Sequence, residues 1–477
     1  MNDMSKYKMT IGLEIHAELK TKSKMFCGCS NSPEGAEPNA FVCPICMGHP
    51  GTLPTINKEA VRSVLLVGTA LGGKLADFTE FDRKNYFYPD IPKGYQISQY
   101  KYPLVSGGSL AGIDLTRIHL EEDTARSSHD TGEDSLVDFN RAGVPLMELV
   151  TEPVIHSATE AMRFSRELQL LLQYLGVSDA NMEKGEMRVE VNISVSNTDK
   201  FGTKVEVKNI NSHRAAGRAI EYEYKRQVEL LEKGEEVVQE TRGWDENKQK
   251  TFSQRSKENA HDYRYFPEPD LPKLFISEIA DFDREKLKAS LPELPEEKRI
   301  RYAKDFGIKN EDIEVYIQNK KVGEFFEAVL GKMSGAMEFA KLSSNYITTD
   351  LIGLSKMIDG EFSVGKITPD YFAKLITRVS GGELSSRGAK DILKIMFEVG
   401  GDPEIIAKEK GLMQKNNEKE LEIIIEKILE SNSKTVQEYK NGKESVLQFF
   451  VGQAMRETKG SANPEILKKI ILEFLQK

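Results

Sequence analysis

The stretch Ile11-Gly-Leu-Glu-Ile-His-Ala-Glu-Leu19 alternates between two kinds of side chain. Apolar residues occupy its odd-numbered positions, whereas Glu14, His16 and Glu18 occupy three of the even ones. Because successive side chains of a β-strand point to opposite faces of its sheet, the stretch predicts a strand with one apolar face and one face of ionisable groups. Glu is depleted in ordinary strands, so exposure to water alone is a poor explanation for this polar face.

Three other stretches repeat the pattern, namely Met187–Val195, Val205–Lys208 and Arg117–Asp123, the last of which ends in three consecutive acids. A single strand of this kind is explained by a half-buried antiparallel sheet with one wet face. Four such strands favour one continuous polar face. Neighbouring carboxylates repel and raise each other's pKa, and a divalent cation removes that penalty. The pattern therefore predicts a magnesium-binding sheet, with the merely wet face as the alternative.

All four cysteines lie between positions 27 and 46, as Cys27-Gly-Cys29 and Cys43-Pro-Ile-Cys46. Four thiolates at close spacing match the preference of zinc for soft ligands in tetrahedral sites, and disulfides are disfavoured in a cytosolic chain. The spacing therefore predicts a structural zinc site. Because C-x-C is less usual than C-x-x-C, unliganded cysteines are the alternative.

Length and charge limit the class of protein. A chain of 477 residues is expected to form two or three domains. Its polar start and the lack of a run of 18 apolar residues argue against a signal peptide and a membrane span, so we expect a cytoplasmic location. The net charge is −9, yet residues 401–477 carry 13 basic and 13 acidic residues. Binding of RNA would therefore need a local basic patch, and the neutral tail permits one.

The residue patterns change along the chain. Up to about residue 290, short β-type runs with helices at Asn57–Leu71 and Ala158–Tyr174 predict an α+β fold with an antiparallel sheet. We place domains at 1–292 (with the zinc-binding insertion 27–46), 293–400 and 401–477. Helical spacing dominates the last two, at Glu296–Phe306, Lys320–Leu330, Glu418–Glu430, Ser445–Thr458 and Pro464–Gln476, the last with Asn463 as its N-cap. The polar stretch Gln239–Asp270 is expected to be a long functional loop.

The usual nucleotide and hydrolase motifs are absent. The chain has no G-x-x-x-x-G-K-[ST] and no strand-linked G-x-G-x-x-G, so any use of ATP must rely on magnesium and basic side chains. It also has no G-x-S-x-G nucleophile motif.

Several longer motifs resemble one known family. They are Gly12–His16, Asn85–Asp90 with Pro92–Gln96, His119–Asp123, Asp138–Arg141 with Pro145–Glu148, Met182–Gly185, Val207–Ser212, Asp262–Pro269 and Phe450–Gln453. Together they resemble the B subunits of tRNA-dependent Asp/Glu amidotransferases over essentially the whole chain.

The resemblance implies a heterotrimeric ligase. Its B chain would use ATP and Mg²⁺ to phosphorylate the side-chain carboxylate of Glu or Asp wrongly attached to tRNA(Gln) or tRNA(Asn). Ammonia from a partner amidase, the glutaminase or A chain of the trimer, would then displace phosphate, and a small third protein, the C chain, would join the pair. The resemblance further implies a catalytic domain similar in fold to glutamine synthetase and guanidino kinases. A helical domain and a YqeY-like tail that hold the tRNA would follow it.

The resemblance and the chemistry of phosphoryl transfer suggest roles for individual residues. Magnesium would be held by Glu14, His16, Glu121, Glu122, Glu148 and Glu190. Because Mg²⁺ prefers oxygen ligands, His16 is either a ligand of a softer ion or a group behind the ligands. Basic groups at the phosphates would be Arg188, Lys208, Arg141 and Lys84, each of which could instead be a surface charge with an ordinary partner. Asn140 and Asn192 would orient phosphates or ribose, or else be structural. The catalytic set is therefore expected to be Glu14, His16, Arg188 and Glu190.

Two matters stay open at the level of sequence. The aromatic tract Tyr86–Pro89 and the run Tyr95–Tyr100 either stack on the 3′ end of a tRNA or form core and loop packing. The function itself has two alternatives, a free-standing ATP-dependent carboxylate–amine ligase and a non-catalytic scaffold that binds zinc and RNA.

Overall fold

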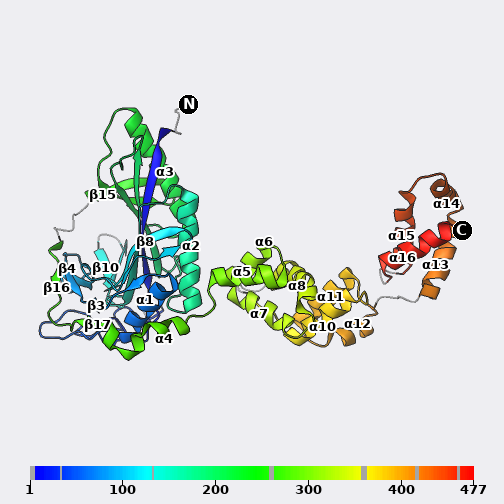
Figure 1. The fold of residues 1–477 in the computed structure, drawn as a ribbon, viewed down its shortest axis with the longest axis horizontal. Helices are drawn as coiled ribbons and strands as arrows, with labels where there is room; N and C mark the ends of the chain where they lie inside the picture. The colour runs from blue at the N-terminus through cyan, green and yellow to red at the C-terminus, as the bar shows by residue number, and fades with distance from the viewer. Residues whose placement is uncertain are drawn as a thin grey trace. The chain divides into compact units, whose positions relative to one another are not determined.

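The computed structural model of the chain describes residues 6–32, 35–131, 134–256, 263–355, 362–413, 418–458 and 462–476. The chain separates into two compact units, residues 1–295 and 296–477 (Figure 1). None of the helices formed by the described residues is both long and apolar enough to cross a membrane.

A ten-stranded sheet forms the centre of the first unit. Its order is β15 (Lys250–Ser256), β14 (Glu240–Asp245), β13 (Val205–Lys208), β12 (Met187–Ser196), β1 (Lys8–Glu18), β11 (Pro145–Thr151), β8 (Ile113–Glu122), β6 (Val105–Ser106) and β2 (Lys74–Leu75), with β7 (Ser109–Leu110) paired to β8. Only β13 and β14 run parallel, because helix α3 (His213–Glu232) connects them and returns the chain in the same direction. The sheet is therefore mixed, and the predicted antiparallel arrangement is wrong at this one pair.

Helices cover the apolar face of this sheet. Ile11, Leu13 and Ile15 of β1 are fully buried and share one core with residues of α1 (Lys58–Ala70), α2 (Ala158–Leu175) and α3. Figure 1 shows α2 and α3 running along one side of the sheet. Side chains at Asn57, Ser157 and Ser212 cap the three helices by accepting hydrogen bonds from backbone N–H groups. The even-numbered side chains of β1 therefore lie on the other face.

Smaller elements complete the first unit. They are the sheets β16 (Phe266–Pro267), β4 (Asp82–Asn85) and β5 (Tyr95–Ser98); β3 (Phe78–Thr79) and β17 (Leu274–Phe275); β9 (Arg126–Thr131) and β10 (Asp134–Asp138); and the short helices η3 (Ile276–Glu278), η4 (Ala280–Phe282) and α4 (Arg284–Ala289). Strand β5 packs against β8, and the Ser98 hydroxyl donates a hydrogen bond to Glu121 at 2.9 Å. The β4–β5 hairpin thus reaches the polar groups at the end of β8.

The predicted loop Gln239–Asp270 is largely strand. It contains β14, β15 and β16, while residues 257–262 lie outside the described residues. These strands lack the alternation of apolar residues that would predict them from sequence. Polar side chains pair with one another instead: Arg242 donates hydrogen bonds to Thr251 at 2.8 Å and to Glu240. Trp244 supplies most of the apolar burial.

The second unit is helical. It consists of α5 (Pro295–Phe306), α6 (Asn310–Gln318), α7 (Lys320–Leu330), α8 (Ala336–Asn345), the π-helix η5 (Tyr346–Leu351), α9 (Ile352–Ser355), α10 (Pro369–Ser380), α11 (Ser386–Glu398), α12 (Pro403–Glu409), α13 (Glu418–Ser431), α14 (Ser433–Lys440), α15 (Val446–Glu457) and α16 (Pro464–Leu475). The seven helices predicted from spacing, two of them in the first unit, are confirmed to within about two residues at each end.

The tail has a core of its own. Helix α12 packs against α10 and α11, whereas a separate cluster that includes Leu421, Phe450 and Ile470 joins α13, α15 and α16. The predicted boundary at residue 400 therefore precedes a helix that packs with the helices before it. The division into three domains stays a prediction.

Candidate functional site

Strand register places the predicted acidic residues in rows across the polar face. Arg188 of β12, His16 of β1, Glu148 of β11 and His119 of β8 form one row, because each is the register partner of the next. In the adjacent row Glu14 lies opposite Glu190. Directly opposed side chains in antiparallel pairs lie about 4.5–5.5 Å apart at Cβ. The shared polar face predicted from alternation is thus present in the fold.

His16 lies at the centre of this face. Its Nε2 atom is 3.3 Å from Glu148, 3.8 Å from Glu121 and 4.0 Å from Glu14. Burial by itself lowers the pKa of His16, but the hydrogen bond to Glu148 and the charges of the surrounding carboxylates raise it to about 9. The imidazole is therefore protonated at neutral pH in the metal-free chain, and its proton supplies positive charge among the carboxylates.

Glu14 is a carboxyl of this face whose pKa is raised. Burial and the charges of Glu148 and Glu190 raise its pKa to about 7. On its outer side, Glu190 lies 2.9 Å from the ammonium of Lys208, and Lys208 also lies 3.8 Å from Glu206. Lys208 thus lies beside two carboxylates and neutralises one end of the acidic row.

His119 and Glu148 form the buried side of the centre. His119 Nε2 lies 3.7 Å from Glu121 and 3.5 Å from Glu148, and Glu148 also lies 3.4 Å from Arg117. Burial opposes ionisation of Glu148, but the charge of His119, the hydrogen bond to His16 and the charges of His16 and Lys84 lower its pKa well below the usual range. Although His119 is buried, its Nδ1 atom has no hydrogen-bond partner among the described residues.

Arg188 and Arg141 meet at one buried carboxylate. Arg188 donates a hydrogen bond to Asp123 at 2.7 Å, and Arg141 Nε lies 3.7 Å from the same oxygen. Burial opposes ionisation of Asp123, but the two guanidinium groups lower its pKa to about 2. Arg141 also donates hydrogen bonds to the carbonyls of Thr124 and Ala125 at 3.0 Å. Both arginines are therefore anchored by protein groups at the edge of the polar face.

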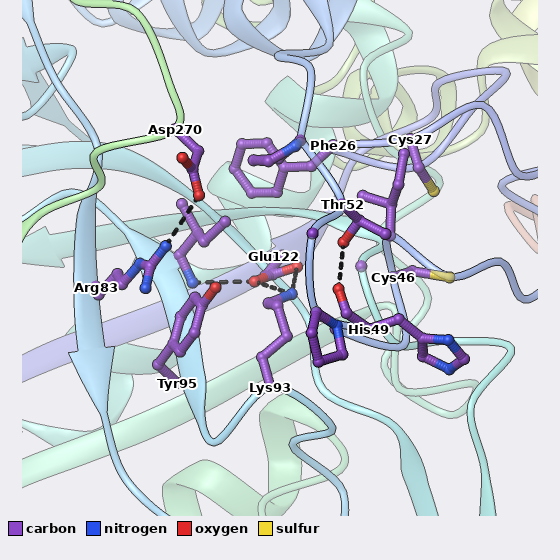
Figure 2. A pocket seen from close by; sticks show the side chains of 17 residues that line it. Phe26, Cys27, Cys46, His49, Thr52, Arg83, Lys93, Tyr95, Glu122 and Asp270 are labelled. Atoms are coloured by element: carbon purple, nitrogen blue, oxygen red, sulfur yellow. Dashed lines mark hydrogen bonds and ion pairs between the residues drawn. The ribbon is translucent and has the colours of Figure 1, made fainter.

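Glu122 is not part of this centre. Its carboxylate lies 2.6 Å from the ammonium of Lys93 and accepts a hydrogen bond from the backbone N–H of Ile97 at 3.0 Å. Figure 2 shows this ion pair in a cavity of about 210 Å³, with Cys46 in the opposite wall and Arg83 beyond Tyr95. Adjacent residues of a strand point to opposite faces, so Glu121 and Glu122 cannot both lie on the polar face. The structure does not bring Glu122 together with the other predicted metal ligands.

Two further predicted residues, Lys84 and Asn192, lie on other strands of the first unit. Lys84 lies on β4 among Tyr86, Tyr265, Glu121 and Glu148; burial opposes its charge, but these groups raise its pKa well above the ordinary value. Asn192 lies on β12 one register step beyond the acidic row, opposite Gly12.

Asn140 serves the cysteine segment instead. Its side chain accepts a hydrogen bond from the N–H of Phe41 at 2.8 Å and donates one to the carbonyl of Glu37 at 2.8 Å. Both ends of the amide are thus used to hold the loop, so Asn140 is structural here.

Three groups on the polar face have the donors for divalent cations. They are Glu14, His16 and Glu148; His119, Glu121 and Glu148; and Glu14, Glu190 and Glu206, with the ligand atoms of each group within 4.8 Å of one another. Carboxylate oxygens are the ligands that Mg²⁺ prefers, and the Nδ1 atom of buried His119 has no hydrogen-bond partner among the described residues. The residues therefore fit bound divalent cations.

Sequence reasoning missed His119, Glu206 and Asp123 as site residues. The alternation did indicate the first two. His119 is two residues from Glu121, and Glu206 is two residues from Lys208, so each lies on the same face of its strand as the predicted residue. For Asp123, the sequence indicated only that three consecutive acids need positively charged partners. The tertiary structure is needed to show that Arg188 is the partner of Asp123.

The four cysteines converge as predicted. Their sulfur atoms lie within 4.8 Å of one another, and the Cys43 and Cys46 sulfurs are 3.8 Å apart. A tetrahedral site with Zn–S bonds of about 2.3 Å needs sulfur–sulfur separations of about 3.8 Å. Without disulfides between them, the thiols fit a zinc ion.

We expect Cys46→Ser to lose zinc and to loosen the cysteine segment. One ligand of the four is removed, and structural zinc contributes directly to local folding. Metal analysis after dialysis should give about one zinc per wild-type chain and clearly less in the variant. Ser30→Ala, in the same segment, should keep its zinc; equal zinc in Cys46→Ser and wild type would contradict the assignment.

The geometry can be compared with known proteins. The family described as "GatB/GatE catalytic domain" matches residues 9–280, and the one described as "GatB domain" matches residues 324–475. The B subunits of aspartyl/glutamyl-tRNA(Asn/Gln) amidotransferase from Thermoanaerobacter sp. (strain X514) and Thermotoga maritima are 45% and 44% identical to this chain. Both alignments cover 99% of this chain, and they cover 100% and 99% of the two relatives.

These matches place the chain among the carbon–nitrogen ligases. More specifically, the chain belongs to the family of aspartyl/glutamyl-tRNA(Asn/Gln) amidotransferase B subunits. The resemblance seen in the motifs is confirmed, and a non-catalytic scaffold is excluded.

Proposed function

We propose that this chain uses ATP to activate the side-chain carboxylate of Glu or Asp esterified to tRNA(Gln) or tRNA(Asn), and that ammonia from a partner protein then converts it to the amide. The observation that carries the proposal is the row Arg188, His16, Glu148 and His119 with Glu14 and Glu190 beside it. Family membership supplies the substrate class, because the relatives are named for these two tRNAs.

The chemistry explains why such a face is needed. A carboxylate is a poor acyl donor, since its leaving group would be an oxide. One oxygen of the carboxylate attacks the γ-phosphorus of ATP, the bond to ADP breaks, and an acyl phosphate forms. The ammonia nitrogen then attacks the acyl carbon, inorganic phosphate leaves, and the nitrogen loses a proton.

The residues divide this task. Glu14, Glu121, Glu148, Glu190 and Glu206 with His16 and His119 would hold divalent cations, which neutralise the phosphates and align them for in-line transfer. Lys84 brings a buried positive charge beside Glu121 and Glu148, where it can bind an oxygen of the transferred phosphoryl group. Lys208 and Arg188 fix the orientation of Glu190 and Asp123 at the two ends of the face.

Phosphate release tests the proposal and its alternative. The chain assembled with the amidase and the small third protein should release phosphate from ATP only when misacylated tRNA is present, and should form the amidated aminoacyl ester when glutamine is added. A free-standing ligase that acts on small molecules would release phosphate without tRNA. Turnover that is indifferent to tRNA would overturn the proposal.

The tail is proposed to contribute to tRNA binding. Removal of residues 414–477 takes away helices α13–α16 with their own core and leaves α12 on its neighbours. We expect the dissociation constant for tRNA to rise by about tenfold or more, while binding of ATP stays unchanged, because the acidic face lies in the first unit. Filter binding of tRNA and equilibrium binding of ATP provide the comparison; unaltered tRNA affinity would contradict this role.

A further inference from the structure

Four tyrosines from two distant segments lie together beside the acidic face, and Phe87 stands between two of them in the sequence. We call the five residues the aromatic rim: Tyr86, Phe87, Tyr88, Tyr263 and Tyr265. Ring centroids are 5.8 Å apart for Tyr86 and Tyr88, 5.9 Å for Tyr86 and Tyr263, and 6.0 Å for Tyr263 and Tyr265. The two segments are held together by the Asn85 side chain, which donates hydrogen bonds to the carbonyls of Tyr263 at 3.2 Å and Arg264 at 2.9 Å. The two segments of the rim are therefore fixed to each other by hydrogen bonds as well as by ring contacts.

Part of the rim is open to solvent. Phe87 is 78% exposed and Tyr88 is 43% exposed. The Phe87 ring lies close to the backbone of Gly94, where a Cβ atom would come within 3.1 Å of the ring. Because glycine has no side chain, the ring can pack against this backbone. An aromatic ring held in this way offers a supported flat surface, on which a planar group can stack.

The rim adjoins the proposed reaction centre. The ammonium of Lys84 lies 4.9 Å from the ring centroid of Tyr263 and 5.7 Å from that of Tyr86. Glu121 and Glu148 act electrostatically on Lys84 and on Tyr265. Lys84 thus lies between two tyrosines of the rim and the carboxylates of the polar face.

A basic residue completes the composition of this surface. Arg264 lies between Tyr263 and Tyr265, is exposed, and has a left-handed backbone conformation with φ of 46°. Its carbonyl accepts the hydrogen bond from Asn85, so the backbone is held in place while the side chain is exposed to solvent. Aromatic rings interleaved with arginine are typical of surfaces that bind unpaired nucleotides through stacking and phosphate contacts.

We propose that the aromatic rim binds the unpaired 3′ end of the tRNA substrate by stacking of its terminal bases. The inference rests on the proposed function and deepens it. The amino acid is esterified to the terminal ribose, so the terminal nucleotide lies only one amino-acid length from the carboxylate that is activated. A supported, exposed aromatic surface next to Lys84 is where those nucleotides fit.

A cycle of protein and RNA truncations tests the proposal. The ligands are uncharged tRNA and the same tRNA without its terminal unpaired nucleotides; the proteins are the assembled complex with wild-type chain, Phe87→Ala or Phe201→Ala. Phe201 is the matched control, because it is 72% exposed in the connection between β12 and β13. Loss of one stacked base should weaken binding by about tenfold.

We expect Phe87→Ala to weaken the intact tRNA about tenfold and to leave the truncated tRNA unaffected, whereas Phe201→Ala changes neither. Equal effects of Phe87→Ala on both RNAs, or none on either, would overturn the proposal. So would loss of the partner proteins from the Phe87→Ala complex in gel filtration, which would assign the rim to a protein interface. If ATP-dependent amidation fails in the wild type while the cycle succeeds, the proposed function falls and the rim stands.

Discussion

Glu148→Gln is expected to lower the rate of tRNA-dependent amidation by more than about 100-fold. The substitution keeps the size of the side chain and removes one negative charge from a residue shared by two of the three candidate cation groups. Loss of a group next to a metal ligand commonly costs 10–100-fold in activity, and loss of a ligand costs more.

The structure explains why this position should be the most sensitive. Glu148 lies within 3.5 Å of both His16 and His119, so its carboxylate determines the orientation of two imidazoles as well as the charge of the centre. An amide accepts through one oxygen only, and it cannot satisfy both rings and a cation. ATP-dependent phosphate release in the presence of misacylated tRNA is the direct measurement.

Glu152→Gln is the matched control for this variant. Glu152 follows β11 directly, is partly exposed, and pairs with Thr116 at 2.8 Å, away from the cation groups. Its activity should remain within about twofold of wild type. Near-normal amidation by Glu148→Gln, or an equal loss in both variants, would contradict the placement of the reaction on this face.

The sequence predicted which side chains lie on the polar face of the sheet, but not the order or register of the strands. Alternation in β1, β12, β13 and β8 correctly separated core positions from polar ones, because the period of a strand is two and one face is buried. It could not reveal which strands are neighbours. That information lies in register, which placed Glu148 between His16 and His119.

The errors share a physical cause, since each depends on a contact between segments far apart in sequence. The resemblance and the chemistry predict the same metal role for Glu121 and Glu122, but strand geometry and its partner Lys93 place Glu122 in the cavity beside Cys46. Of the two roles open to Asn140, the structure favours the structural one, because its amide holds the cysteine segment. The sequence does not indicate β14, because Arg242 and Glu240 pair with each other at positions where apolar residues would have predicted a strand.

Arg188→Met is expected to destabilise the first unit by about 3 kcal/mol at neutral pH. Removal of one partner of a buried ion pair leaves an uncompensated charge, at a cost of about 3–5 kcal/mol. The remaining partner is Asp123, which is 4% exposed, and Arg141 at 3.7 Å compensates only in part, which favours the lower end of that range. Urea unfolding of the full chain, followed by the fluorescence of Trp244, measures the change.

The pH dependence of this loss has a defined sign. The pKa of Asp123 is lowered from 3.8 to about 2 in the folded chain, so the ion pair stabilises the fold above pH 3.8 and this contribution disappears as the pH falls toward 2. The part of the difference between wild type and Arg188→Met that comes from Asp123 should therefore shrink below pH 4. Asp123→Asn combined with Arg188→Met should recover part of the stability, because no charge is then left buried. A difference that grows below pH 4, or a double variant less stable than Arg188→Met alone, would show that Arg188 does not act through Asp123.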